Sequence, residues 1–169
     1  MSMQGSIANL AFDTSSDGPT SNYVGAVALI ERLHRLLLDV IKDEFERLGL
    51  LDVSSVQALL LYNIGDNEVT AGEMKSRGYY QGSNVSYNLK KLVDGGYMHH
   101  QRCEIDRRSV RNKLTEKGCE VRDVVAGLFE RHSGQLSEID SLNGGRLAEM
   151  TADLRRLGRF WTDQIRYIY

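Results

Sequence analysis

Residues 82–93 contain small polar, amide and basic side chains of the kind that hydrogen-bond to DNA. On a helix that turns 100° per residue, Val85, Leu89, Leu92 and Val93 gather on one side. The side chains facing away from them can reach base edges near the start of the helix and phosphates further along. These are Ser83, Asn84, Tyr87, Lys90 and Lys91, with Ser86 and Asn88 on the flanks. An amphipathic helix with a merely solvated polar face is the alternative interpretation.

A second charged group, Asp106-Arg107-Arg108, lies in a polar stretch between two short apolar segments, and Arg111 follows on the second segment. An arginine at the tip of a slender hairpin can enter the minor groove, where A·T-rich DNA concentrates negative potential. We expect Asp106 to hold an arginine through a charge-assisted hydrogen bond. A solvated turn with a local ion pair explains the hairpin alone equally well.

The charges of the chain are unevenly distributed. The formal net charge is −2 over 169 residues. Between Lys75 and Lys117, however, ten basic side chains stand against four acidic ones, which gives this segment a net charge of +6. A basic segment in an acidic chain fits local phosphate contact, although a salt-bridged surface has the same composition.

Apolar periodicity predicts the elements that position these groups. Residues 1–20 are polar and show no period, which predicts a flexible arm. A long helix follows from about residue 21, and Gly49 ends it. Its apolar positions are spaced four and three residues apart, as in a coiled-coil seam. They are Ala26, Ile30, Leu33, Leu37 and Val40.

Three short helices and a hairpin are expected next. Ser54-Ser55-Val56-Gln57 has the form of a capping box, and Thr70 is a candidate N-cap for a helix over residues 70–77. The third helix covers residues 82–93 and ends at Gly95-Gly96. Residues 97–103 and 110–114 are predicted to form the two strands of a hairpin.

Two further helices complete the chain. Thr115 opens one helix, Asn143-Gly144-Gly145 interrupts it, and the last helix has apolar residues three and four apart. The small middle unit cannot cover the seams of the outer helices, so we expect a second copy to do so. An intramolecular bundle is the alternative. The expected dimer interface contains Ile30, Leu33, Leu37, Leu154, Leu157 and Trp161.

Other function classes find little support. The chain has no G-x-S-x-G string, phosphate loop or H-E-x-x-H motif, so we expect no enzyme and no cofactor. His99-His100-x-x-Cys103 is not a recognised metal-ligand spacing, and we expect no metal. Cys103 and Cys119 are interpreted as small buried apolar residues rather than redox sensors. With no signal peptide and no apolar run of about 20 residues, we expect a cytoplasmic chain without a membrane span.

Asp106-Arg107-Arg108-Ser109-Val110-Arg111-Asn112-Lys113-Leu114-Thr115-Glu116-Lys117-Gly118 resembles the wing of the MarR-type winged-helix transcription regulators. It is similar to the family's D-x-R signature and to the L-T-x-x-G start of the next helix. Leu89-x-x-Leu92-Val93-x-x-Gly96-Tyr97 is similar to the end of its recognition helix. The resemblance covers nearly the whole chain after residue 20, but Tyr79-Tyr80-Gln81-Gly82 is not a general family string.

The resemblance implies a mainly α (α+β) winged helix-turn-helix fold that binds double-stranded DNA. Residues 49–115 would form the DNA-binding lobe. The N- and C-terminal helices, residues 21–48 and 116–169, would form an intertwined dimerisation body. Family members bind pseudo-palindromic sites as homodimers, usually repress, and often release DNA when a small aromatic or anionic effector binds. The effector pocket would lie where the first helix, the second helix and the helix after Thr115 converge, near His34, Tyr62 and Arg122.

The leading hypothesis is therefore a ligand-responsive repressor that recognises a specific DNA sequence. A regulator that binds DNA constitutively, without an effector, is the first alternative. The second is a winged-helix dimer that binds a protein. Phosphate contacts would make binding fall steeply with salt, whereas a largely apolar protein interface would not.

Overall fold

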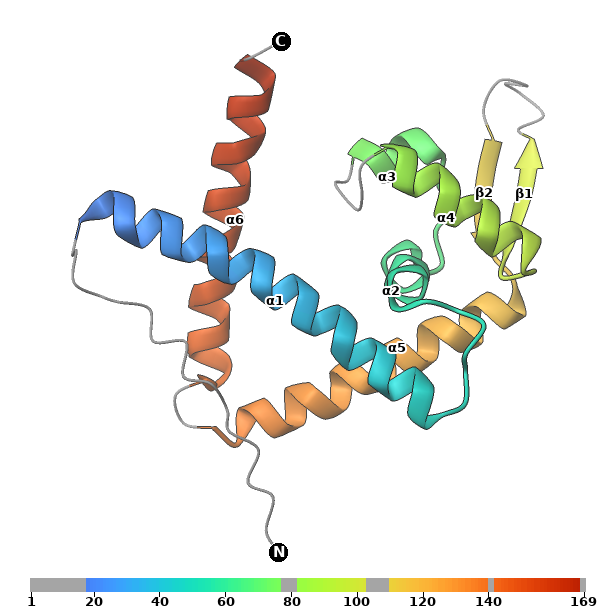
Figure 1. Cartoon of the computed structure of the whole chain (residues 1–169), viewed down its shortest axis with the longest axis horizontal. Helices are drawn as coiled ribbons and strands as arrows, with labels where there is room; N and C mark the ends of the chain where they lie inside the picture. The colour runs from blue at the N-terminus through green and yellow to red at the C-terminus, as the bar shows by residue number, and fades with distance from the viewer. Residues whose placement is uncertain (1–17, 77–81, 103–109, 140–141, 168–169) are drawn as a thin grey trace, which may run out of the picture. The chain divides into compact units, whose positions relative to one another are not determined.

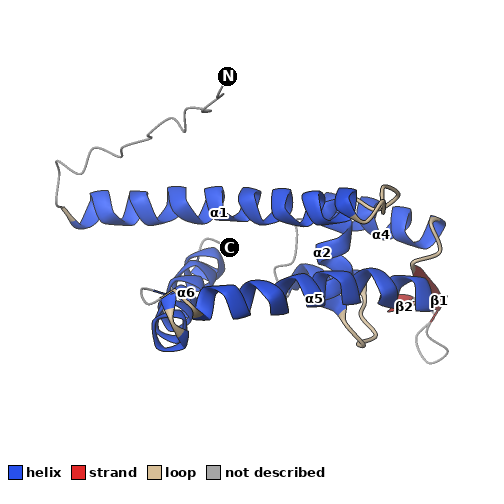
Figure 2. Ribbon diagram, turned by 90° about the horizontal axis from the view of Figure 1, so that it is seen from below, coloured by secondary structure: helices blue, strands red, loops and turns tan. Residues whose placement is uncertain are grey.

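The computed structural model describes residues 18–76, 82–102, 110–139 and 142–167. These residues form helices and one antiparallel hairpin (Figures 1 and 2), which confirms the expected mainly α class and winged-helix fold. The helices are α1 (Pro19–Arg47), α2 (Ser55–Ile64), α3 (Ala71–Ser76), α4 (Gly82–Asp94), α5 (Glu116–Ser137) and α6 (Gly144–Tyr167). The strands are β1 (Met98–Arg102) and β2 (Val110–Leu114). In the described ranges, no helix is both long and apolar enough to cross a membrane.

The chain divides into two units, Met1–Val40 and Ile41–Tyr169. In the first unit, the structure describes the larger part of α1. The helix begins at Pro19, two residues before the predicted start. Proline suits this first position because its missing N–H has no partner there in any case, and its fixed φ already matches the helix. The expected flexibility of residues 1–17 lies outside the described residues.

Local chemistry sets most helix ends where the sequence places them. Gly49 has φ +71° and follows α1 in a Schellman arrangement, with the Leu50 N–H donating to the Phe45 carbonyl at 2.9 Å. Ser54 and Gln57 form the predicted capping box before α2. The Thr70 hydroxyl accepts from the Glu73 N–H at 3.1 Å, which confirms it as an N-cap.

The core of the second unit lies between α2 and α5. Helix α2 is apolar on nearly all sides and buries Ala58 through Leu61 together with Ile64. Helix α5 contributes Val121, Val125 and Leu128. The Tyr62 ring meets the Phe129 ring edge-on, with 4.9 Å between centroids. This packing fixes the helix that follows the hairpin against the centre of the lobe.

The expected interface residues lie on faces that the single chain leaves largely open. Leu33 of α1 is 59% exposed and Leu154 of α6 is 48% exposed. Ile30, Leu37, Leu157 and Trp161 are half-buried. None of the described residues of α6 is buried, although the helix has a clear apolar seam.

Tyr97 joins the end of α4, the start of β1 and the start of α5. Its N–H donates to the Leu92 carbonyl at 2.8 Å and its carbonyl accepts from the Thr115 N–H at 3.1 Å. The Thr115 hydroxyl donates to the Gly96 carbonyl at 2.7 Å and accepts from the Gly118 N–H at 3.1 Å. A Cβ atom on Gly118 would lie 2.1 Å from the Tyr97 oxygen, so no larger residue fits there.

A buried carboxylate joins the last turns of α1 to α5. Glu44 is 9% exposed and accepts from Arg47 Nε at 2.9 Å and from Arg131. The hydrogen bonds from Arg47, followed by those from Arg131, lower the pKa of Glu44 to about 2, against the opposing effect of its burial. The carboxylate therefore remains charged where it is held by two guanidinium groups.

We expect Gly118→Ala to lower the free energy of unfolding by about 2 kcal/mol or more, because the new methyl group collides with the Tyr97 carbonyl. Gly134→Ala on the same helix is the matched control. No atom lies within 4 Å of its added Cβ, so the substitution should stabilise by about 0.5–1 kcal/mol. Urea unfolding monitored by circular dichroism measures both. Equal stability of the two variants would contradict the close approach at Tyr97.

Glu44→Gln should cost stability at neutral pH, and this cost should shrink as the pH falls from about 4.5 to about 2. The reason is that the folded pKa is depressed. The charged carboxylate stabilises the fold above its unfolded pKa and loses that effect on protonation. Unfolding free energies at several pH values measure the difference. Glu46→Gln, at an exposed position paired with Lys42 at 3.5 Å, is the control and should show little such trend. A pH-independent cost for Glu44→Gln would refute the assignment.

Candidate nucleic-acid interface

Helix α4 has the two faces that its sequence predicts. Val85, Leu89 and Leu92 are buried, and Val93 is half-buried. Asn88, expected on a flank, is also buried, at 9% exposed. The core therefore holds one side of α4 along most of its length and leaves the other side free.

The open side of α4 presents polar and basic groups. Ser86, Tyr87, Lys90 and Lys91 are all exposed, and Lys91 Nζ lies 5.9 Å from the centroid of the Tyr87 ring. Four residues separate these two, so they are neighbours on the helix surface. Ser83 and Asn84 belong to α4, but their side chains lie outside the described part. The described side chains can donate to phosphates and to base edges.

The hairpin pairs in an antiparallel register from Met98↔Leu114 to Arg102↔Val110. Arg111 on β2 is exposed, and it forms no ion pair with any described residue. Lys113 lies on the same strand face, since side chains two residues apart point the same way. Its Nζ is 3.7 Å from Glu68 Oε1. Asp106, Arg107 and Arg108 lie outside the described residues.

A buried asparagine ties the hairpin to the helices before it. Asn112 is 2% exposed, and its Nδ2 donates to the Val69 carbonyl at 3.2 Å. The main chains of Val69 and Asn112 exchange hydrogen bonds of 3.0 and 2.8 Å, which form an isolated bridge. His100 Nδ1 lies 3.1 Å from Asn112 Oδ1. Because Asn112 Nδ2 donates to Val69, Oδ1 is the acceptor and Nδ1 the donor in this contact. No local pattern in the sequence indicates this role of Asn112.

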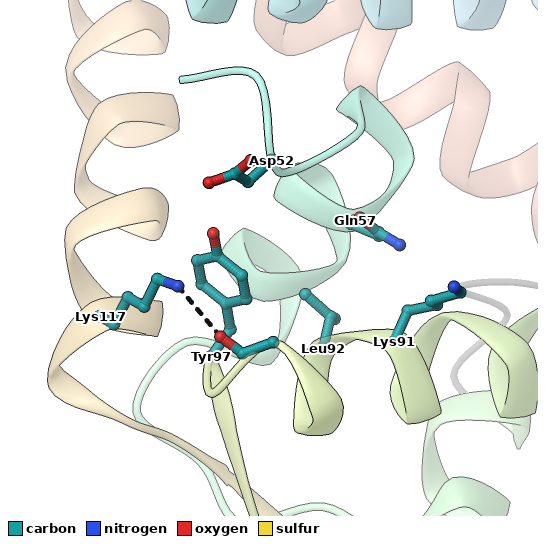
Figure 3. Close-up of a pocket in the computed structure, with 7 residues that line it drawn as sticks. Asp52, Gln57, Lys91, Leu92, Tyr97 and Lys117 are labelled. Atoms are coloured by element: carbon teal, nitrogen blue, oxygen red, sulfur yellow. Dashed lines mark hydrogen bonds between the residues drawn. The ribbon is translucent and has the colours of Figure 1, made fainter. Parts of the chain in front are cut away.

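Lys117 is a second residue whose role the sequence does not indicate, although it lies within the Thr115–Gly118 string. Its Nζ lies 4.0 Å from the centroid of the Tyr97 ring and donates to the Gly95 carbonyl at 3.0 Å. Gly95 follows the last turn of α4, where unpaired carbonyls favour a positive charge. Figure 3 shows the Tyr97 ring between Lys117 and Leu92, with its hydroxyl turned toward Asp52. Lys117 thus links α5 to the end of α4.

The three residues expected around an effector pocket have different surroundings. Tyr62 packs on Phe129, and Arg122 binds Asp123 at 2.9 Å and also Asp66. These two carboxylates, with Asp123 the stronger influence, raise the pKa of Arg122 above its usual value. His34 belongs to the other unit and is exposed. Through its bond to Asp66, Arg122 of α5 holds the turn that follows α2.

Of the histidines and cysteines considered as metal or thiol sites, the structure describes His99, His100 and Cys119. No group of three or more His, Cys, Asp or Glu side chains in the described ranges could hold a metal ion. His99 and His100 alternate along β1 and so point to opposite faces. Cys119 is a free thiol and is half-buried, whereas Cys103 is outside the described part.

Comparison with known proteins identifies the same middle segment. The winged helix DNA-binding domain family matches residues 53–118. The exopolysaccharide II synthesis transcriptional activator ExpG of Rhizobium meliloti (strain 1021) is 34% identical over 157 residues. The match covers 92% of this chain and 79% of ExpG.

Solved structures share the fold. FabT of Streptococcus pneumoniae, solved in complex with DNA, aligns with a TM-score of 0.63 and 23% identity over 84% of this chain and 99% of that chain. MarR of Staphylococcus aureus, in complex with salicylate and kanamycin, aligns with a TM-score of 0.66 and 16% identity. That alignment covers 85% of this chain and 93% of the other.

Proposed function

The chain belongs to the MarR family of winged helix-turn-helix regulators, and from that premise we propose that it binds a pseudo-palindromic operator as a homodimer. The chain is a DNA-binding transcription regulator. The observation that carries the proposal is that α4 has an exposed polar and basic face and that Arg111 on β2 is also exposed.

In the proposed complex, α4 enters the major groove. Ser83, Asn84, Ser86 and Tyr87 lie toward its N-terminal end and face base edges, whereas Lys90 and Lys91 face phosphates. Arg111 and the hairpin tip with Asp106, Arg107 and Arg108 approach the flanking backbone and minor groove. The buried Asn112 supports this assignment, because it ties the strand that carries Arg111 to the segment before α3.

We propose that two copies associate through the apolar seams of α1 and α6. Ile30, Leu33, Leu37, Leu154, Leu157 and Trp161 supply the interface. The support is that α6 buries none of its described residues in the single chain. Burial of such apolar side chains is the main source of stability in homodimer contacts. Two-fold symmetry would present two α4 helices to two half-sites.

The sign of regulation has two candidates. The family resemblance leads us to expect repression, whereas ExpG, the relative that is 34% identical, is named an activator. The relative favours activation as the second candidate. Expression of a reporter gene placed behind a DNA site that the protein binds, measured with and without the protein, distinguishes activation from repression.

A small effector is the remaining part of the proposal. Salicylate, an aromatic anion, is present in the Staphylococcus aureus MarR structure. We place the effector of this chain near Tyr62 and Arg122 of the DNA-binding unit. Arg122 is the residue suited to an anion, and an anionic ligand would compete with its bonds to Asp66 and Asp123.

Selection of genomic fragments by the purified protein should recover one palindromic motif, with half-sites about 10 base pairs apart. The two-fold arrangement of the α4 helices requires this symmetry. Sequencing of the bound fragments and binding at two salt concentrations are the measurements. If no motif is enriched and binding disappears at moderate salt, specific regulation is refuted and the protein-partner alternative takes its place.

Arg111→Ala should weaken operator binding and make the slope of log affinity against log salt shallower, by about one for each phosphate that the arginine neutralises. Lys113→Ala is the matched control on the same strand face. Its ammonium already faces Glu68, so its removal should change the slope less. Fluorescence anisotropy at several salt concentrations measures both variants. Equal effects from the two would exclude Arg111 from the residues that bind phosphate.

A further inference from the structure

One aromatic side chain on the open face of α4 differs in kind from its polar and basic neighbours. Of the residues between 53 and 118 that the structure describes, Tyr87 is the one large apolar side chain that is exposed, at 62%. We propose that Tyr87 determines the specificity of α4 by contacting the 5-methyl group of a thymine, with Lys91 as the residue that positions its ring. The inference rests on the proposed DNA-binding function and deepens it, since it names the base and the group on that base.

The position of Tyr87 on α4 is one from which a helix in the major groove contacts bases. At 100° per residue, Tyr87 lies nearly opposite the buried Val85, Leu89 and Leu92. It is the sixth of the 13 residues of the helix, and the N-terminal part of such a helix is the part that meets base edges. The side chain therefore points away from the core, near the middle of the surface that faces DNA in the proposed complex.

The chemistry of the ring suits one feature of the major groove. Among the four bases, thymine alone presents a methyl group there, and proteins recognise that group by apolar contact. Tyrosine offers a large apolar surface on only two side-chain torsions, so little conformational entropy is lost when the ring is fixed against a base. The exposed Ser86, Lys90 and Lys91 can hydrogen-bond to base edges or phosphates, but they carry no comparable apolar surface. The thymine methyl group is therefore the partner that the Tyr87 ring fits best.

Lys91 lies beside the ring, one turn further along the helix. Its Nζ is 5.9 Å from the centroid of the Tyr87 ring, which is within the range of a cation–π interaction. A cation over one face of the ring restricts its orientation and leaves the opposite face and the ring edge to meet a base. The ammonium group has three N–H donors and can bind a phosphate at the same time. The pair thus combines a contact that depends on sequence with one that does not.

Deoxyuridine in place of thymine removes the methyl group and leaves base pairing unchanged, so it tests the contact directly. Duplexes of the selected operator, substituted at one thymine at a time, are titrated with the full chain and followed by fluorescence anisotropy. In each half-site, one substitution should weaken binding about fourfold, the effect expected for burial of one methyl group. Substitution at that position in both half-sites should weaken binding about fifteenfold. The ratio of the two affinities, thymine over deoxyuridine, is the quantity to compare between variants.

Variants of α4 assign the methyl contact to the ring. Tyr87→Phe keeps the ring and should keep the fourfold ratio, whereas Tyr87→Ala should reduce it to about one. Lys91→Gln should lower it to about twofold, because the ring is no longer held by a cation. Lys90→Ala is the matched control, an exposed neighbour whose loss should weaken binding to all duplexes alike and leave the ratio unchanged. Thermal unfolding followed by circular dichroism establishes that each variant is folded.

Three results would overturn the inference about Tyr87. They are an operator that tolerates deoxyuridine at every thymine, an unchanged ratio in Tyr87→Ala, and an equal loss of the ratio in Tyr87→Phe and Tyr87→Ala, which would assign the contact to the hydroxyl group. An unchanged ratio in Lys91→Gln would refute the positioning role of Lys91. Failure of the proposed function is distinguishable from all of these, because the wild-type chain would then enrich no motif in the genomic selection, whereas in each of these results it still binds its operator specifically.

Discussion

The close approach of Gly118 to the Tyr97 carbonyl is the constraint on which the arrangement of the DNA-binding unit depends. Because a Cβ would lie 2.1 Å from that oxygen, the first turn of α5 can touch the main chain after α4 only through a glycine. The contact lets the Thr115 hydroxyl bridge Gly96 and Gly118, and Lys117 lies over the Tyr97 ring. Hydrogen bonds and close packing therefore join the end of α4, the start of β1 and the start of α5.

Buried polar groups extend this connection to the rest of the second unit. Asn112 joins β2 to Val69, and Glu44 joins the end of α1 to Arg131 of α5. A buried polar group that loses its partner costs more than an apolar contact of the same size. These ties thus specify one relative placement of helices that apolar packing alone would leave adjustable. The charged side chains of α4 and β2 take no part in these buried contacts, so they remain exposed to solvent and able to contact phosphates.

The sequence predicts features whose causes are local. The capping box at Ser54, the helix ends at Gly49 and Gly96, and the buried face of α4 follow from residues within one or two turns of each other. The Tyr97–Lys117 and Val69–Asn112 contacts join residues about 20 or more positions apart, and no local pattern encodes them. The sequence identified the exposed face of α4, but it placed Asn88 on a flank where the structure buries it.

The junction at Tyr97 also bears on how a dimer of the proposed kind would present its two α4 helices. Helix α5 packs on α2, and α4 is tied to α5, so the position of each α4 helix follows that of its own α5. In a two-fold complex, the separation of the two α4 helices must match about one turn of DNA. Because the two copies would be related by symmetry, a small rotation at the Tyr97 junction would occur in both copies. It would shift both α4 helices relative to their half-sites. The contacts of Tyr97 with Thr115, Lys117 and Gly118 therefore decide how α4 is placed relative to α5, and hence how the two α4 helices of a two-fold complex would be spaced.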